Sequence, residues 1–172
     1  MGIKGTTTFS LKDQLFNADS VALLAAALAR AQPRFARARF ERAVLARFPE
    51  LELKQRIQWL VTNLENRLPG DFPQALEALR RALPAPLDPT LRDDDFGQFI
   101  WVVPGEYVAK HGCKESHLTA SLAFLREATM RFSSESALRP FLQRYPEATL
   151  RFVHDCAEDA NYHVRRLASE GI

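Results

Sequence analysis

The side chains in this sequence that could do chemistry are carboxylates, arginines and aromatic rings, because no set of metal-ligating or nucleophilic residues has a catalytic spacing. Glu135 follows Ser133 and Ser134, at the expected start of a helix that contains Pro140. A helix N-terminus keeps a nearby carboxylate ionised, so Glu135 is a candidate for an anion that faces a developing positive charge. The alternative is that Glu135 only stabilises the end of its helix.

A second candidate carboxylate is Glu106, which follows Pro104 and has Tyr107 beside it and Trp101 upstream. We expect the helix over residues 98–112 to break at Pro104. An aromatic ring and a carboxylate at such a break can hold a cationic group by cation–π and Coulomb attraction. The alternative is that Trp101 is a core residue and Glu106 an acid near a helix start.

Four basic residues of the last third could form a row of phosphate contacts along successive helix starts, where backbone N–H groups would assist. They are Arg139, His163, Arg165 and Arg166. The alternative is that Arg165 and Arg166 pair with acidic residues nearby in the sequence, namely Asp155, Glu158 and Asp159.

Several classes of function are excluded by motifs that the sequence lacks. The seven glycines include no GxGxxG or P-loop spacing, and there is no HExxH, CxxC or nucleophile elbow. The four histidines do not stand at i, i+4. We therefore expect no dedicated metal site and no cofactor.

Composition favours a cytoplasmic protein with one domain. The chain has 172 residues and two cysteines, too few for a disulfide framework, and Cys156 falls on an apolar stripe. No apolar window is long enough to span a membrane. The net charge of +2 permits contact with a polyanion, so an interaction with DNA would depend on where the arginines lie.

The elements that must position these residues are all predicted to be helices. Apolar residues recur at helical spacing, most regularly over 52–67, where Ile57, Leu60, Val61 and Leu64 follow i, i+3, i+4, i+7. We predict an all-α fold, a HEAT-like α-solenoid of about ten helices in antiparallel pairs, because the helices are short and the turns between them shorter. A plain helical bundle is the alternative. The single domain covers residues 1–172, with one long loop at about 84–97 that holds the acidic run 93–95.

Capping residues and prolines predict where several helices begin. A short helix over 6–17 is capped by Ser10 and buries Leu11 and Leu15, and the next is capped by Asn17 or Asp19. Asp71 and Pro146 begin two others.

Prolines and apolar spacing also set the register of the helices in the last third. Pro140 either lies in a first turn behind Ser136, or kinks a helix that starts at Ser133. The helix that begins at Pro146 is expected to face inward with Leu150, Val153 and Ala157.

The last helix has the pattern with which the second helix of a HEAT repeat usually starts. Asp159 or Asn161 caps it, Val164, Leu167 and Ala168 pack inward, and the arginines point outward.

Five blocks of sequence together resemble the AlkC branch of the AlkC/AlkD-like DNA alkylation-repair glycosylases, which are HEAT-like solenoids. The resemblance spans nearly the whole chain, and its last two blocks are the most specific. The blocks are 9–17, 48–57, 104–109, 131–142 and 159–171.

The resemblance implies an enzyme that removes cationic N-alkylated bases, such as 3-methyladenine and 3-methylcytosine, from double-stranded DNA without deep base flipping and without a cofactor. By the match, Glu135 is the carboxylate near the lesion, and Glu106 and Asp159 are further catalytic candidates. Arg139, Arg165 and Arg166 would hold the DNA backbone, with His163 and Trp101 as further DNA contacts.

Two features depart from the family pattern. Ser136 stands where the family typically has a large aromatic residue after the glutamate. Relatives also continue past Gly171, so we expect this chain to lack C-terminal repeats. The alternatives to a glycosylase are a non-catalytic HEAT-like scaffold that binds DNA or protein, and a DNA binder that recognises bends or junctions without excision.

Overall fold

The computed structural model describes residues 10–90 and 97–172, and all regular structure in these residues is helical. Residue 9, the first of the N-terminal block of the resemblance, lies outside the described residues. The acidic run 93–95 lies outside them entirely. The α-helices are α1 (Leu11–Leu15), α2 (Ala18–Ala31), α3 (Arg37–Leu45), α4 (Leu53–Glu65), α5 (Phe72–Ala82), α6 (Val102–Gly112), α7 (Leu118–Thr129), α8 (Glu135–Arg144), α9 (Pro146–Ala157) and α10 (Tyr162–Glu170). Short 3₁₀ helices cover Phe48–Glu50, Phe99–Trp101 and Glu115–His117.

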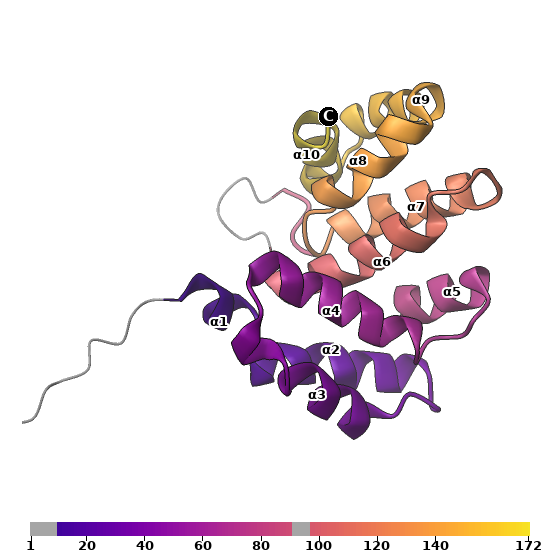
Figure 1. Cartoon of the computed structure of the whole chain (residues 1–172). Coiled ribbons are helices and arrows are strands. Elements are labelled where there is room, and N and C mark those ends of the chain that lie inside the picture. Colours follow the sequence, from indigo (N-terminus) through magenta and orange to yellow (C-terminus); the bar gives the residue numbers. More distant parts are fainter. Residues whose placement is uncertain (1–9, 91–96) are drawn as a thin grey trace, which may run out of the picture.

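The helices stack in two layers, which confirms the predicted HEAT-like α-solenoid (Figure 1). In one layer α4, α6 and α8 are successive neighbours. In the other, α2 packs on α5, α5 on α7, and α7 on α10. Each amphipathic helix therefore buries its apolar face against helices of the same and of the other layer, as in repeat proteins.

The predicted caps set the starts of several helices. The Asn17 side chain accepts from the Ser20 amide at 3.0 Å and begins α2, and the Asn161 side chain accepts from the His163 amide at 2.9 Å and begins α10. Pro73 and Pro146 stand in first turns, where a missing N–H costs no intrahelical bond.

Two predictions about prolines need correction. The helix over 98–112 is not broken at Pro104, because α6 begins at Val102 and Pro104 falls in its first turn. Glu106 therefore lies within a continuous helix. Pro140 lies inside α8, which is flanked by Ser134 as N-cap, so the carbonyl of Ser136 has no amide four residues on to accept from.

Burial was predicted wrongly on two helices. Leu11 is 53% exposed, and the buried residue of that segment is Phe16. On α9, Leu150 is 51% exposed and Ala157 is exposed, whereas Thr149, Val153 and Cys156 face inward. The inward face of α9 thus keeps the predicted Val153 but has Thr149 and Cys156 in place of Leu150 and Ala157.

The core is confirmed on the remaining helices. Fully buried side chains from several helices form one cluster, including Leu24 and Leu28 of α2, Phe40 of α3, Phe124 of α7 and Phe141 of α8. Cys156 belongs to this cluster, and burial raises the pKa of its thiol to about 11. In the described residues, no helix has the length and apolar character that crossing a membrane would require.

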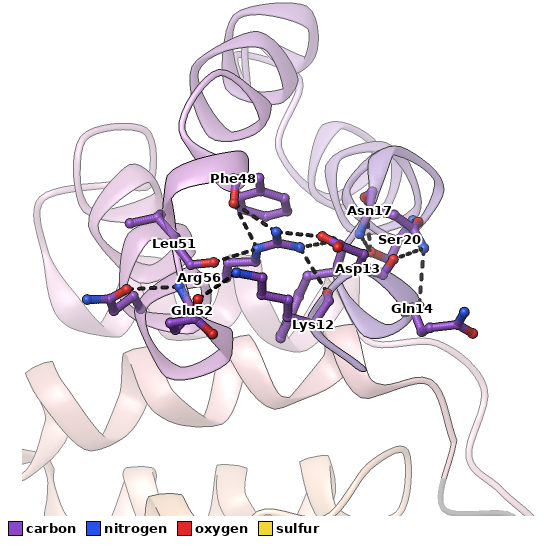
Figure 2. Close-up of polar contacts among 11 residues, drawn as sticks. Lys12, Asp13, Gln14, Asn17, Ser20, Phe48, Leu51, Glu52 and Arg56 are labelled. Carbon is purple, nitrogen blue, oxygen red and sulfur yellow. Dashed lines mark hydrogen bonds and ion pairs between the residues drawn. The ribbon is translucent and has the colours of Figure 1, made fainter. Parts of the chain in front are cut away.

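A buried arginine anchors the N-terminal helix to the first repeats (Figure 2). The Arg56 side chain on α4 is 2% exposed and donates to the carbonyl oxygens of Phe48 (2.8 Å), Leu51 (3.2 Å) and Phe16 (2.8 Å). It also donates to the Lys12 carbonyl at 3.0 Å and to the Asp13 carboxylate at 2.6 Å. The guanidinium therefore satisfies carbonyls that end α1 and the 3₁₀ turn before α4.

Replacing Arg56 by Met should lower the free energy of unfolding by about 3 kcal/mol, since buried carbonyls lose their donors and Asp13 loses its partner. Urea unfolding measures this, with Arg42→Met as the matched control because Arg42 is exposed on α3. The control should stay within about 0.5 kcal/mol of the wild type. Equal stability of the two variants would contradict the anchoring role.

Candidate functional site

A hollow of about 520 Å³ is lined by the first turns of α6 and α8 and by Arg166 in the middle of α10. We call it the Glu135 hollow. Its charged residues are Glu135 and Arg139 of α8 and Arg166 of α10. Its remaining lining is mostly apolar, from Leu15, Gly97, Phe99, Val102, Phe132, Ser133 and Ser136. The hollow thus places one carboxylate and two guanidinium groups over an aromatic and aliphatic surface.

Glu135 and Arg166 form an ion pair that bridges α8 and α10. The distance from Arg166 Nη2 to Glu135 Oε1 is 2.9 Å, and the two side chains are 24% and 22% exposed. Oε1 is inaccessible to solvent and has no hydrogen bond of good geometry, so the contact is an ion pair and not a directed hydrogen bond. The pair therefore ties the carboxylate to α10, with Oε1 closed to solvent.

Gly97 closes the hollow on the side of the long loop. Its φ is +76°, in the left-handed region, and a Cβ there would stand 2.0 Å from the carbonyl oxygen of Arg131. Only glycine fits both conditions. This turn delivers Phe99, whose ring contacts that of Phe132 edge-on with centroids 5.0 Å apart, to the floor of the hollow.

Glu106 lies on α6 and accepts a hydrogen bond from Ser136, which lines the Glu135 hollow. Ser136 donates from Oγ to Glu106 Oε1 at 2.5 Å. The helices α6 and α8 come close here because Gly105 faces Ala137, and a Cβ on Gly105 would stand 3.4 Å from that of Ala137. Glu106 itself lines an adjacent hollow of about 400 Å³ between α4 and α6.

The third carboxylate, Asp159, is engaged in the turn between α9 and α10. Its side chain is 9% exposed, and it accepts from the Arg126 guanidinium, with Nε at 2.9 Å, and from the Asn161 amide at 2.8 Å. Burial opposes ionisation, but these donors hold the pKa of Asp159 below its ordinary value. Asp159 is not among the residues that line the Glu135 hollow.

Arg165 is held in the same turn and does not line the Glu135 hollow. Its Nη1 donates to the carbonyl oxygens of Asp159 at 2.7 Å and Ala160 at 2.8 Å. Of the predicted arginine row, Arg139 and Arg166 therefore share the hollow with Glu135, and Arg165 closes the turn. The alternative considered from sequence, that Arg166 pairs with acids nearby in the chain, is not what the structure has, since Arg166 forms an ion pair with Glu135 on α8.

Two predicted DNA contacts are buried. His163 is 4% exposed, and its Nε2 lies 2.9 Å from the carbonyl oxygen of Asp88. Because a carbonyl only accepts, this nitrogen carries the hydrogen, and the histidine fastens the loop before residue 91 to α10. Trp101 is 5% exposed within the core, which is the alternative that its sequence context left open.

Sequence reasoning missed the partners of the site carboxylates. Neither the Ser136–Glu106 hydrogen bond nor the Glu135–Arg166 pair has a local pattern, since each joins helices about thirty residues apart. The one available signal was that small residues adjoin the two hydrogen-bonded positions. Gly105 precedes Glu106, and Ala137 follows Ser136. Within residues 10–90 and 97–172, no group of three or more His, Cys, Asp or Glu side chains is placed to hold a metal ion.

Comparison with solved structures identifies the architecture. The chain superposes on the Pseudomonas fluorescens alkylpurine DNA glycosylase AlkC, bound to DNA containing an abasic site analog, with a TM-score of 0.78 and 30% identity over 96% of the chain. The chain has an AlkC-type fold. It is also 30% identical over 159 residues to the uncharacterized protein YhaZ of Bacillus subtilis (strain 168). No family model matches the chain.

The AlkC-type region spans only part of these relatives. It covers 43% of the Pseudomonas AlkC chain and 41% of YhaZ, so the chain spans about two fifths of the proteins it matches. The recognition of an AlkC-type solenoid from sequence is confirmed, because the structural match covers almost the whole chain. The chain therefore shares the fold of the part of that DNA glycosylase with which it superposes.

The role of Asp159 in the α9–α10 turn predicts a specific dependence of stability on pH. Because its folded pKa is depressed, its contribution is present above the unfolded pKa of about 3.9 and is lost as pH falls through the lower, folded value. Asp159→Asn should therefore cost about 1 kcal/mol of unfolding free energy at pH 7, a modest figure because Arg126 is largely in water.

The difference between wild type and Asp159→Asn should shrink as the pH is lowered below 4, measured by urea unfolding at a series of pH values. Asp155→Asn, at an exposed carboxylate of α9, is the control and should leave stability nearly unchanged. A difference that is constant from pH 7 to pH 3 would contradict the assigned role.

Proposed function

We propose that this chain is the lesion-facing part of a DNA glycosylase that hydrolyses the N-glycosidic bond of cationic N-alkylated bases in double-stranded DNA. The observation that carries the proposal is the Glu135 hollow within an AlkC-type fold, which is lined by one carboxylate and two guanidinium groups. The named neighbour is an alkylpurine DNA glycosylase bound to DNA with an abasic site analog, which is the product side of such a reaction.

The chemistry suits a site with carboxylates and no cofactor. An N-alkylated base that already carries a positive charge leaves as a neutral molecule with the electron pair of the C1′–N bond, so no strong general acid is required. The deoxyribose then develops oxocarbenium character, and a nearby anion lowers the energy of that transition state. Water adds to C1′ and gives up one proton.

The proposal assigns Glu135 to the sugar and Arg139 and Arg166 to phosphate oxygens. Glu135 borders the open hollow, and its side chain is 22% exposed. Arg139 is exposed, and Arg166 lines the hollow from the middle of α10 with a side chain that is 24% exposed, so both can approach a backbone phosphate beside the lesion. Glu106 is a second catalytic candidate. Asp159 and Arg165 stabilise the turn between α9 and α10. His163 and Trp101 are buried in the interior.

The proposal also covers the cellular compartment and the way in which the chain contacts DNA. Cys113 and Cys156 are free thiols, which suit a reducing cytoplasm where a bacterial chromosome also lies. Shallow contact with the duplex, without deep base flipping, suits a hollow that is open along one side. The relatives are more than twice as long, so the proposal covers the activity that this region would contribute.

A second candidate function is a HEAT-like scaffold that binds DNA or protein without catalysis. The observation that favours it is the Glu135–Arg166 pair, which in a scaffold would simply fasten α8 to α10. Activity and salt dependence separate the two functions.

Release of methylated base from alkylated duplex DNA tests the catalytic assignment. The wild-type chain should release base, and Glu135→Gln should be slower by on the order of 10²-fold, the usual cost of losing one electrostatic contact to a transition state. Glu115→Gln, at an exposed residue outside the hollow, should match the wild type. No release by the wild type, or equal release by Glu135→Gln, would contradict the proposal.

A salt titration of duplex binding tests the phosphate contacts. Arg139→Gln should weaken binding and reduce the slope of log K against log salt concentration by about 1, because one fewer counterion is displaced. Arg42→Gln, at an exposed arginine of α3, should leave both unchanged. Affinity of the wild type that barely changes with salt would favour the scaffold.

A further inference from the structure

Ser136 connects the two hollows that contain the glutamates. It is exposed in the first turn of α8 and lines the Glu135 hollow. Its hydroxyl hydrogen is committed to Glu106 Oε1, 2.5 Å away on α6. A hydroxyl has one hydrogen and two lone pairs, so this bond leaves Ser136 Oγ only acceptor capacity toward the Glu135 hollow.

The bond also restricts where the Glu106 carboxylate can lie. Glu106 is only half-buried and also borders the adjacent hollow with Lys110 and Pro140, so a free side chain would have several rotamers available. The Gly105–Ala137 contact brings α6 and α8 close enough for the serine to reach it. A short hydrogen bond to an ionised acceptor is stronger than a neutral one and selects one rotamer.

We propose that Ser136 is a positioning residue that holds Glu106 at the edge of the Glu135 hollow, so that the site acts with two carboxylates. Glu135 faces the developing positive charge on the sugar. Glu106, held by Ser136, orients the water and accepts the proton that the water gives up as its oxygen bonds to C1′. The inference rests on the proposed glycosylase function. It adds Glu106 as a second catalytic carboxylate and Ser136 as the residue that positions it.

A double-mutant cycle tests this pairing. Single-turnover release of methylated base from alkylated duplex is measured for wild type, Ser136→Ala, Glu106→Gln and the double variant. Ser136→Ala should slow release by on the order of tenfold to a hundredfold, as expected for a displaced catalytic group, with duplex affinity unchanged. In the Glu106→Gln background the same change should have almost no further effect, because the group that Ser136 places is already lost.

Two further variants separate positioning from folding. Ser136→Thr keeps the hydroxyl at an exposed site with room for a methyl group, and it should recover most of the rate. Ser116→Ala, at an exposed serine outside both hollows, should behave as wild type. The melting temperature of every variant is measured, and those of the Ser136 variants should match the wild type.

The outcomes distinguish this inference from the proposed function. If the wild type is active and Glu135→Gln is slow, but Ser136→Ala keeps the wild-type rate, only the positioning role falls. The same holds if Ser136→Ala costs equally in the Glu106→Gln background, or if Ser136→Thr is as slow as Ser136→Ala. An inactive wild type overturns the glycosylase proposal and this inference together.

Discussion

The position of the first turn of α8, which is joined by one side chain to α6 and by another to α10, is the constraint on which the candidate site depends. On one side, the small residues Gly105 and Ala137 let α6 and α8 approach closely, and Ser136 bonds to Glu106. On the other, Glu135 pairs with Arg166 of α10. Because Glu135 and Ser136 are consecutive in one first turn, each points to a different neighbour, about 100° apart around the helix. One helix start thereby organises both carboxylates.

The rest of the solenoid serves to hold that helix start in place. Arg56 satisfies the carbonyls that end α1 and precede α4, while Arg126 and Arg165 close the α9–α10 turn around Asp159. Arg56 and Arg165 complete backbone hydrogen bonding where helices end, a need that every short-helix repeat shares. Arg139 and Arg166 are placed differently from Arg56 and Arg165, because both border the Glu135 hollow.

Local sequence was sufficient to predict the helices and most of the core. Asn17 and Asn161 cap helices as expected, and the spacing of Leu60, Val61 and Leu64 gave the buried face of α4 correctly. Proline position was harder, because Pro104 reads as a break until the start of its helix is known. Long-range partners could not be predicted: Arg56 reaches Phe16 across 40 residues, and Ser136 reaches Glu106 across 30. Such pairs depend on how helices stack, which no local pattern encodes.

The central claim is that the Glu135 hollow is where this AlkC-type region meets damaged DNA. The most direct measurement is a crystal structure of the chain with a duplex containing an abasic site analog. The account predicts the abasic sugar beside Glu135, with Arg139 and Arg166 on the flanking phosphates. A duplex bound on a surface that excludes α8 and the start of α10 would contradict it.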